Sequence, residues 1–200
     1  FDFANTPITG NITFTAVWDI HAKEIKTSGM DYDLSDETQS INIDMDAEDN
    51  ATEVETVQIA KGGDVYDNIS ATISDGVISI AYSELSITAG AGYTITVETD
   101  GFRYVVSEVT FATKIIKTAQ ELADLCTSTY SGVLSGYYIL GNDIDGNGTI
   151  GTHEAGSGDA AGFDTDALGF SGTFDGRGCS ISNFGLSNGG LFGRVQANSK

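Results

Sequence analysis

The stretch GAGYTITVETDGFRYVVSEVTF (Gly90–Phe111) decides the fold class of this chain. On both sides of Asp100–Gly101, apolar or aromatic residues alternate with polar ones, and Thr, Val and Ile are frequent. Alternation with a period of two places the apolar side chains on one face of a β-strand. Asp-Gly is a favoured turn between paired strands. The stretch therefore predicts a late strand, a tight turn and a closing strand.

Similar short alternating runs precede this hairpin. They are NITFTAVW (11–18), QSINIDMDA (39–47) and GVISIAYSEL (76–85). Gly, Asp and Asn separate these runs, and turn signals recur about every ten residues, as in sandwich folds. The chain is therefore predicted to have an all-β fold, with an antiparallel β-sandwich in its first two-thirds.

The composition limits the classes of function. The chain has 200 residues, 29 acidic against 9 basic, and a formal charge of −20. Such a surface repels nucleic acids and anionic membranes and suits a solvated extracellular protein. The ten acids between Asp31 and Glu55 are interpreted as a solvated face, with no Lys or Arg among them. No apolar run is long enough for a membrane helix, and the start lacks both Met and a signal peptide, which suggests an excised piece.

The pattern changes near Lys114. TAQELADLC (118–126) is the one good helix candidate, because Thr118 and Glu121 form a capping box. After it, Gly becomes dense and short apolar runs such as GYYIL (136–140) follow, as in solenoid coils. We place domain boundaries at residues 1–21, 22–113 and 114–200. Cys126 and Cys179 are interpreted as buried free thiols, with a disulfide as the alternative.

Two resemblances concern the first two segments. The opening FDFANTPITGNITFTAVWD (1–19) resembles the end of a Listeria–Bacteroides repeat, a small β-grasp-like module of bacterial surface proteins. The segment 22–113, through Gly90–Phe111, is similar to the immunoglobulin-like modules of such proteins.

The last segment carries a more specific resemblance, to the start of a GLUG-type right-handed parallel β-helix. Its ordered motifs are IKTAQELADL, GYYILGNDIDGNG and FSGTFDGRGCSISNFGLSNGGLFGRV. The matching residues are Tyr138, Leu140, Asp143 and Asp145, then Phe170, Gly172, Phe174, Asp175 and Gly176, then Gly190, Leu191, Phe192 and Gly193. The resemblance implies that the short helix caps the first coils of a solenoid whose further coils lie elsewhere.

One stretch is a candidate metal site. From Asp143, NDIDGNGTIGTHE (142–154) fits the calcium-loop template D-x-[DN]-x-[DN]-G-x5-E. The ligands would be Asp143, Asp145, Asn147, the carbonyl of Thr149, and Glu154. A strand precedes the stretch and a glycine-rich loop follows it, which excludes an EF-hand. Calcium in another geometry stays open, and the favoured alternative is that the carboxylates cap turns by accepting backbone N–H groups.

No catalytic site or organic cofactor is predicted. GNGTIG (146–151) lacks the helix that a dinucleotide site needs, and GLSNG (185–189) lacks a later histidine for a hydrolase. We expect a non-enzymatic, monomeric adhesin or stalk module, extracellular and attached to a cell surface. Its ligand would be a glycan or a host or matrix protein, and not a nucleic acid or a membrane. The alternatives are a lyase-like β-helix enzyme and a carbohydrate-binding module.

Overall fold

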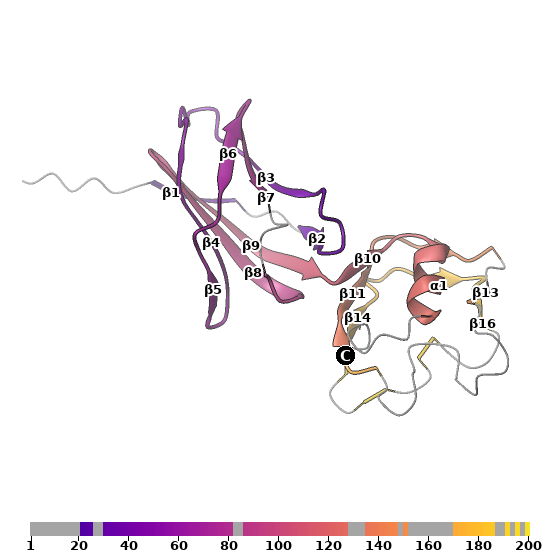
Figure 1. Cartoon of the computed structure of the whole chain (residues 1–200). Coiled ribbons are helices and arrows are strands. Elements are labelled where there is room, and N and C mark those ends of the chain that lie inside the picture. Colours follow the sequence, from indigo (N-terminus) through magenta and orange to yellow (C-terminus); the bar gives the residue numbers. More distant parts are fainter. Residues whose placement is uncertain are drawn as a thin grey trace, which may run out of the picture.

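A computed structural model describes residues 21–25, 30–81, 86–127, 135–147, 150–151, 170–186, 191–192, 195–196 and 199–200. Strands predominate in this part of the chain, and a short helix accompanies them (Figure 1). The prediction of an all-β fold is therefore confirmed for the described residues. The segment that resembles a Listeria–Bacteroides repeat lies, apart from His21, outside them.

The N-terminal module, described between residues 21 and 112, contains β1 to β9. Their bounds are β1 His21–Ile25, β2 Asp31–Asp33, β3 Ser40–Asp44, β4 Val54–Lys61, β5 Asp64–Tyr66, β6 Ala71–Ser74, β7 Val77–Ala81, β8 Gly90–Thr99 and β9 Phe102–Ala112. A six-stranded sheet has the order β1-β9-β8-β4-β5, with β2 also paired to β9. A three-stranded sheet has the order β3-β7-β6.

The hairpin predicted over Gly90–Phe111 is confirmed. β8 pairs with β9 in antiparallel fashion, from Glu98–Arg103 beside the turn to Gly90–Phe111 at the far end. The register shifts between Tyr93 and Ile95, and Glu108 in β9 takes a φ of 59°. An extra residue with left-handed φ is typical of a β-bulge, which bends and twists the strand.

The pairing at the other side of β9 differs from the antiparallel expectation. β1 and β2 both run parallel to β9. Parallel neighbours require a long connection between them, and here the connection contains β3 to β8. The alternating pattern of a strand indicates which faces are buried, but it carries no information about the direction of the neighbour.

The core of this module lies between the two sheets. Ile41 and Ile80 come from the three-stranded sheet, while Ile59 and Ile95 come from the six-stranded sheet, and all four side chains are fully buried. Burial of one such side chain stabilises the fold by about 1.5–3 kcal/mol. The two sheets are therefore held together by a common set of β-branched and aromatic side chains.

The C-terminal module, described between residues 114 and 200, has a different organisation. Its elements are β10 Lys114–Ile116, α1 Ala119–Thr127, β11 Tyr137–Leu140, β12 Ile144–Asp145, β13 Ile150–Gly151, β14 Thr173–Asp175, β15 Ile181–Ser182 and β16 Gly185–Leu186. All pairs between these strands are parallel: β10-β11-β14, β12-β15 and β13-β16. Successive passes of the chain thus lie on one another in register, as with Lys114, Tyr138 and Phe174.

The helix α1 covers the apolar interior of these parallel strands. Leu122 and Leu125 belong to the same buried cluster as Ile116, Tyr138 and Leu140. The predicted capping box is confirmed, since the N–H of Glu121 donates to Thr118 Oγ1 at 3.1 Å and the N–H of Thr118 donates to Glu121 Oε2 at 3.0 Å. These bonds satisfy donors that the first turn of a helix leaves free.

The junction between the two modules contains no linker. β9 ends at Ala112 and β10 begins at Lys114, so Thr113 alone separates them. The N–H of Thr113 donates to the carbonyl of Tyr137 at 2.7 Å, and the N–H of Tyr137 donates back to Thr113 Oγ1 at 2.9 Å. Ala112 and Ile115 are buried with Ile139 in a small cluster of their own.

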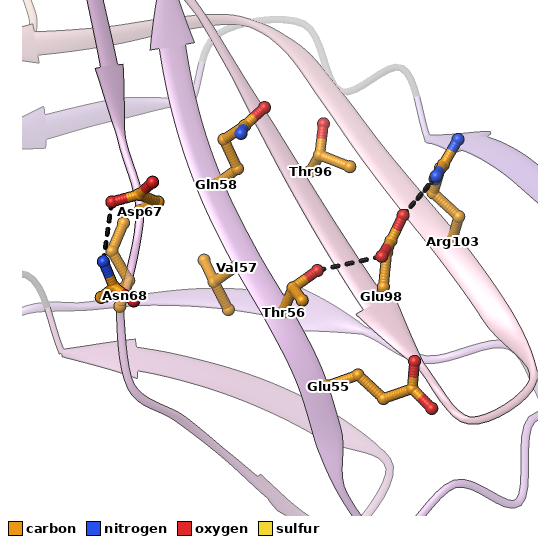
Figure 2. A pocket seen from close by; sticks show the side chains of 10 residues that line it. Glu55, Thr56, Val57, Gln58, Asp67, Asn68, Thr96, Glu98 and Arg103 are labelled. Atoms are coloured by element: carbon orange, nitrogen blue, oxygen red, sulfur yellow. Dashed lines mark hydrogen bonds and ion pairs between the residues drawn. The ribbon is translucent and has the colours of Figure 1, made fainter.

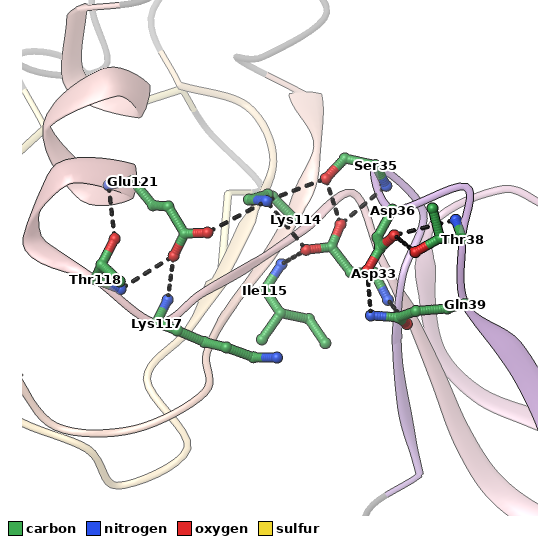
Figure 3. Close-up of polar contacts among 10 residues, drawn as sticks. All are labelled: Asp33, Ser35, Asp36, Thr38, Gln39, Lys114, Ile115, Lys117, Thr118 and Glu121. Carbon is green, nitrogen blue, oxygen red and sulfur yellow. Dashed lines mark hydrogen bonds and ion pairs between the residues drawn. The ribbon is translucent and has the colours of Figure 1, made fainter.

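A buried carboxylate organises this junction (Figure 3). Asp33 at the end of β2 is 5% exposed. It accepts hydrogen bonds from the N–H of Ile115 at 3.0 Å and from the N–H and hydroxyl of Ser35 at 2.9 and 2.6 Å. Lys114 Nζ lies 3.4 Å from Asp33 and 3.4 Å from Glu121, so one ammonium group connects β2 to the start of α1.

A second basic residue makes an independent bridge. Arg177, which follows β14, donates to both carboxylate oxygens of Asp31 at 3.1 and 2.8 Å. It also donates to Thr110 Oγ1 at 3.0 Å and to Asp175 at 3.0 Å. A bidentate guanidinium–carboxylate pair fixes direction as well as distance. Lys114 and Arg177 thus hold β2 against the C-terminal module from two positions.

The charge of Glu121 gives a pH-dependent prediction. Burial alone raises its pKa, but the N–H of Lys117, the charge of Lys114 and the N–H of Thr118 together lower the pKa below its usual 4.5. A lowered folded-state pKa means that the stabilisation is present above the unfolded pKa and is lost as the pH falls through the folded one. Glu121→Gln keeps the capping box and removes the charge.

We therefore expect Glu121→Gln to be less stable than wild type at neutral pH and equal to it well below pH 4.5. Urea denaturation at a series of pH values measures the difference. A difference that persists undiminished in acid would show that the charge of Glu121 is not its source.

Candidate functional site

The acidic corner, defined as Asp143, Asp145 and Asn147, connects two passes of the C-terminal module. Asp143 Oδ1 accepts the N–H of Ser180 at 2.7 Å and its hydroxyl at 3.1 Å. Asp145 Oδ1 accepts the N–H of Asn147 at 3.0 Å and the side-chain amide of Asn183 at 2.9 Å. These bonds lower the pKa of both carboxyl groups, with the N–H donors as the largest cause. Both carboxylates are thus ionised acceptors at neutral pH.

The backbone of the corner explains two of the residue types found there. Asn147 takes a φ of 45°, a left-handed conformation that Asn tolerates better than most residues. Gly146 lies against the neighbouring pass, where an added Cβ would be 2.6 Å from the carbonyl oxygen of Asn183. Gly146 and Asn147 therefore have a structural explanation in the turn, whereas the glycine of the calcium-like template, Gly148, lies outside the described residues.

The five proposed calcium ligands are only partly described. Asp143, Asp145 and Asn147 lie in the corner, whereas Thr149 and Glu154 lie outside the described residues. Within the described ranges, no group of three or more His, Cys, Asp or Glu side chains is arranged to hold a metal ion. The bonds of Asp143 and Asp145 to N–H groups are those that the turn-capping interpretation predicts. The calcium site stays a prediction.

Metal removal distinguishes the two interpretations. If the carboxylates cap turns, Asp143→Ala lowers the melting temperature equally in excess EDTA and in excess calcium, because the lost bonds to Ser180 need no ion. Differential scanning calorimetry in both buffers measures this. A calcium-dependent rise in melting temperature that wild type shows and Asp143→Ala lacks would establish a calcium site instead.

The N-terminal module has a groove on the outer face of its six-stranded sheet (Figure 2). Its volume is about 540 Å³, and residues of β4, β8, β9 and the segment after β5 line it. They are Glu55, Thr56, Val57, Gln58, Asp67, Asn68, Ile69, Thr96, Glu98 and Arg103. Hydroxyl, amide and carboxylate groups thus dominate the surface of the groove.

Some polar groups in this groove bond to one another, and others are directed into the groove. Glu98 accepts from Thr56 Oγ1 at 3.1 Å and from Arg103 Nε at 2.8 Å, and the bonds from Arg103 are the largest cause that lowers its pKa. Gln58 and Thr96 stand between these pairs and the segment of Asp67 and carry polar groups directed into the groove (Figure 2). The groove can therefore donate to and accept from a polar ligand, and it carries more negative than positive charge.

Scans against protein-family models, curated proteins and solved structures found no match for the chain. The resemblances to surface-protein modules therefore remain expectations that rest on the quoted motifs.

The other residues that the sequence singled out are the two cysteines and the serine of the GLSNG motif. Cys179 is a free thiol and is half-buried, and the side chain of Cys126 lies outside the described residues. Ser187 of the GLSNG motif is also outside them. Among the helices that are described, none has the length and apolar character to cross a membrane. The groove was not predicted, although Thr56 and Gln58 on the exposed side of β4 show the alternating pattern that could have indicated it.

Proposed function

We propose that this chain is a non-enzymatic module of a bacterial cell-surface protein, in which a rigid spacer presents the first coils of a β-helix. In this proposal the N-terminal module is an immunoglobulin-like sandwich and the C-terminal module is the capped start of a GLUG-type right-handed β-helix. Two sheets around one core and the parallel passes under α1 support these assignments.

The linker-free junction is the observation that carries the spacer function. Thr113 alone separates β9 from β10, and Asp33 accepts a backbone N–H from Ile115 of the other module. A flexible tether would instead contain several Gly, Ser or Pro residues. A surface module that must hold a binding region at a fixed distance and angle needs such a joint. The formal charge of −20 suits an exterior location.

Surface labelling tests this function. Antibodies raised against the chain should bind intact cells that produce its parent protein, and brief external proteolysis should remove the signal. Labelling that appears only after the cells are permeabilised would contradict the proposal. The same cells with the gene deleted provide the control for antibody specificity.

The groove favours carbohydrate binding as a second candidate function. Its hydroxyl, amide and carboxylate groups match the donors and acceptors of a neutral glycan, and its volume of about 540 Å³ suits a short oligosaccharide. A glycan array tests this with wild type and with the paired substitution Gln58→Ala and Thr96→Val. Binding that both proteins share would place the glycan elsewhere, and binding by wild type alone would assign it to the groove.

A further inference from the structure

At one edge of the larger sheet of the N-terminal module, β1 and β2 run in the same direction as β9. β1 pairs with β9 from His21–Phe102 to Ile25–Val106, and β2 pairs with β9 from Asp31–Thr110 to Asp33–Ala112. Both pairings are parallel. The chain therefore arrives along β1 and β2 and leaves along β9 in the same direction (Figure 1).

This arrangement determines how the module meets tension. A force that pulls on the chain before β1 and after β9 draws the two sides of the parallel ladder lengthwise in opposite directions. The hydrogen bonds between them then resist sliding together, because all are loaded across their length at once. In an antiparallel pair pulled apart from one end, such as β3 with β7, each bond opens before the next is loaded.

The short strand β2 is held to β9 by hydrogen bonds that flank the strand pairing and by an aromatic contact. The N–H of Thr110 donates to the carbonyl of Met30 at 2.9 Å, and the N–H of Leu34 donates to the carbonyl of Ala112 at 2.9 Å. Tyr32, which is 9% exposed, stacks on Phe111 of β9 with 5.6 Å between ring centroids. Sliding of β2 along β9 would break these bonds and separate the two rings.

The bonds that Asp31 and Asp33 make at the junction also oppose sliding of β2 along β9. Arg177 holds Asp31 by two bonds, and the N–H of Ile115 is held by the buried carboxylate of Asp33. Both partners belong to the C-terminal module, which moves with β9 when the chain is pulled. Asp31 and Asp33 of β2 therefore connect this strand to the C-terminal module, which continues from β9.

We propose that β1, β2 and β9 form a shear clamp, reinforced by Asp31–Arg177 and Asp33–Ile115, that lets this module carry tensile load. The proposal rests on the spacer function, since a spacer between a cell and its ligand is placed under tension. It adds to that function a mechanical property of one specific strand pair.

Single-molecule force spectroscopy tests the clamp by a comparison of two pulling directions on the same protein. One direction uses the two ends of the chain. The other uses azide-bearing residues at positions 40 and 81, which are register partners at the end of β3 and β7. We expect the rupture force between the ends to exceed that between positions 40 and 81 by about two-fold or more, because forced unfolding depends on the barrier along the pulled direction. Equal or lower force between the ends would overturn the proposal.

Two variants that each remove one basic side chain test the reinforcement. Arg177→Ala should lower the rupture force between the ends and leave the force between positions 40 and 81 unchanged. Lys61→Ala is the matched control, because Lys61 lies on β4, over the ring of Tyr93, and outside β1, β2 and β9. A decrease in both directions for Arg177→Ala, or an equal decrease for both variants, would overturn the role of Asp31–Arg177.

The force measurement uses the isolated chain, so its outcome is independent of surface labelling. A weak clamp in a chain that antibodies label on intact cells would overturn the load-bearing proposal alone. A strong clamp in a chain confined to the cell interior would overturn the surface function alone.

Discussion

Asp33→Ala is expected to destabilise the protein by about 3 kcal/mol, the loss typical when one partner of a buried charged network is removed. The carboxylate is 5% exposed and accepts the N–H of Ile115 at 3.0 Å. Without it, that N–H stays buried without its acceptor, and Lys114 loses one of the two acids that it contacts. Chemical denaturation followed by circular dichroism measures the free energy of unfolding.

Glu37→Ala is the control for this prediction. Glu37 is an exposed acid in the turn that follows Asp33. Surface substitutions of this kind change stability by no more than about 0.5 kcal/mol. If Asp33→Ala lowers the free energy of unfolding no more than Glu37→Ala does, the junction does not depend on the buried carboxylate. The proposal of a rigid junction would then lose its main evidence.

Gly172→Ala is expected to have a comparable effect on the C-terminal module. An added Cβ at Gly172 would collide with the carbonyl oxygen of Gly136 on the preceding pass. That carbonyl accepts the N–H of Thr173 at 2.9 Å, so the backbone cannot move away without loss of a ladder bond. Overpacking of this kind costs about 1–3 kcal/mol or more. Differential scanning calorimetry should show a lower melting temperature.

Gly176→Ala provides the matched control within the same motif. A Cβ there would be 3.9 Å from the carbonyl oxygen of Cys179, an ordinary contact distance. We expect the free energy of unfolding of this variant to lie within about 1 kcal/mol of that of wild type. Wild-type melting of Gly172→Ala would contradict the close parallel stacking of the two passes.

The features that the sequence could predict depend on neighbours along the chain. The hairpin at Asp100–Gly101 follows from alternation and one turn dipeptide, and the start of α1 follows from Thr118 and Glu121 at capping spacing. Each signal spans only a few residues, and the physics that produces it is local.

The features that could not be predicted depend on residues far apart in the sequence. Asp33 and Ile115 are 82 positions apart, and Arg177 and Asp31 are 146 apart. The parallel direction of β1 and β2 likewise depends on how all the intervening strands are placed. For the acidic corner, the partner of Asp143 is Ser180, 37 positions away, so the sequence left calcium and turn capping both open.

Residual dipolar couplings of backbone amides in a weakly aligned sample test most directly whether the two modules form one rigid body. Couplings from β3 to β9 report the orientation of the N-terminal module, and those from β10, α1, β11 and β14 report the C-terminal module. If the junction is rigid, one alignment tensor, with the same magnitude and axes, fits both sets of couplings to the structure. Two tensors of different magnitude or axes would contradict it, because the modules would then move or sit differently at Thr113.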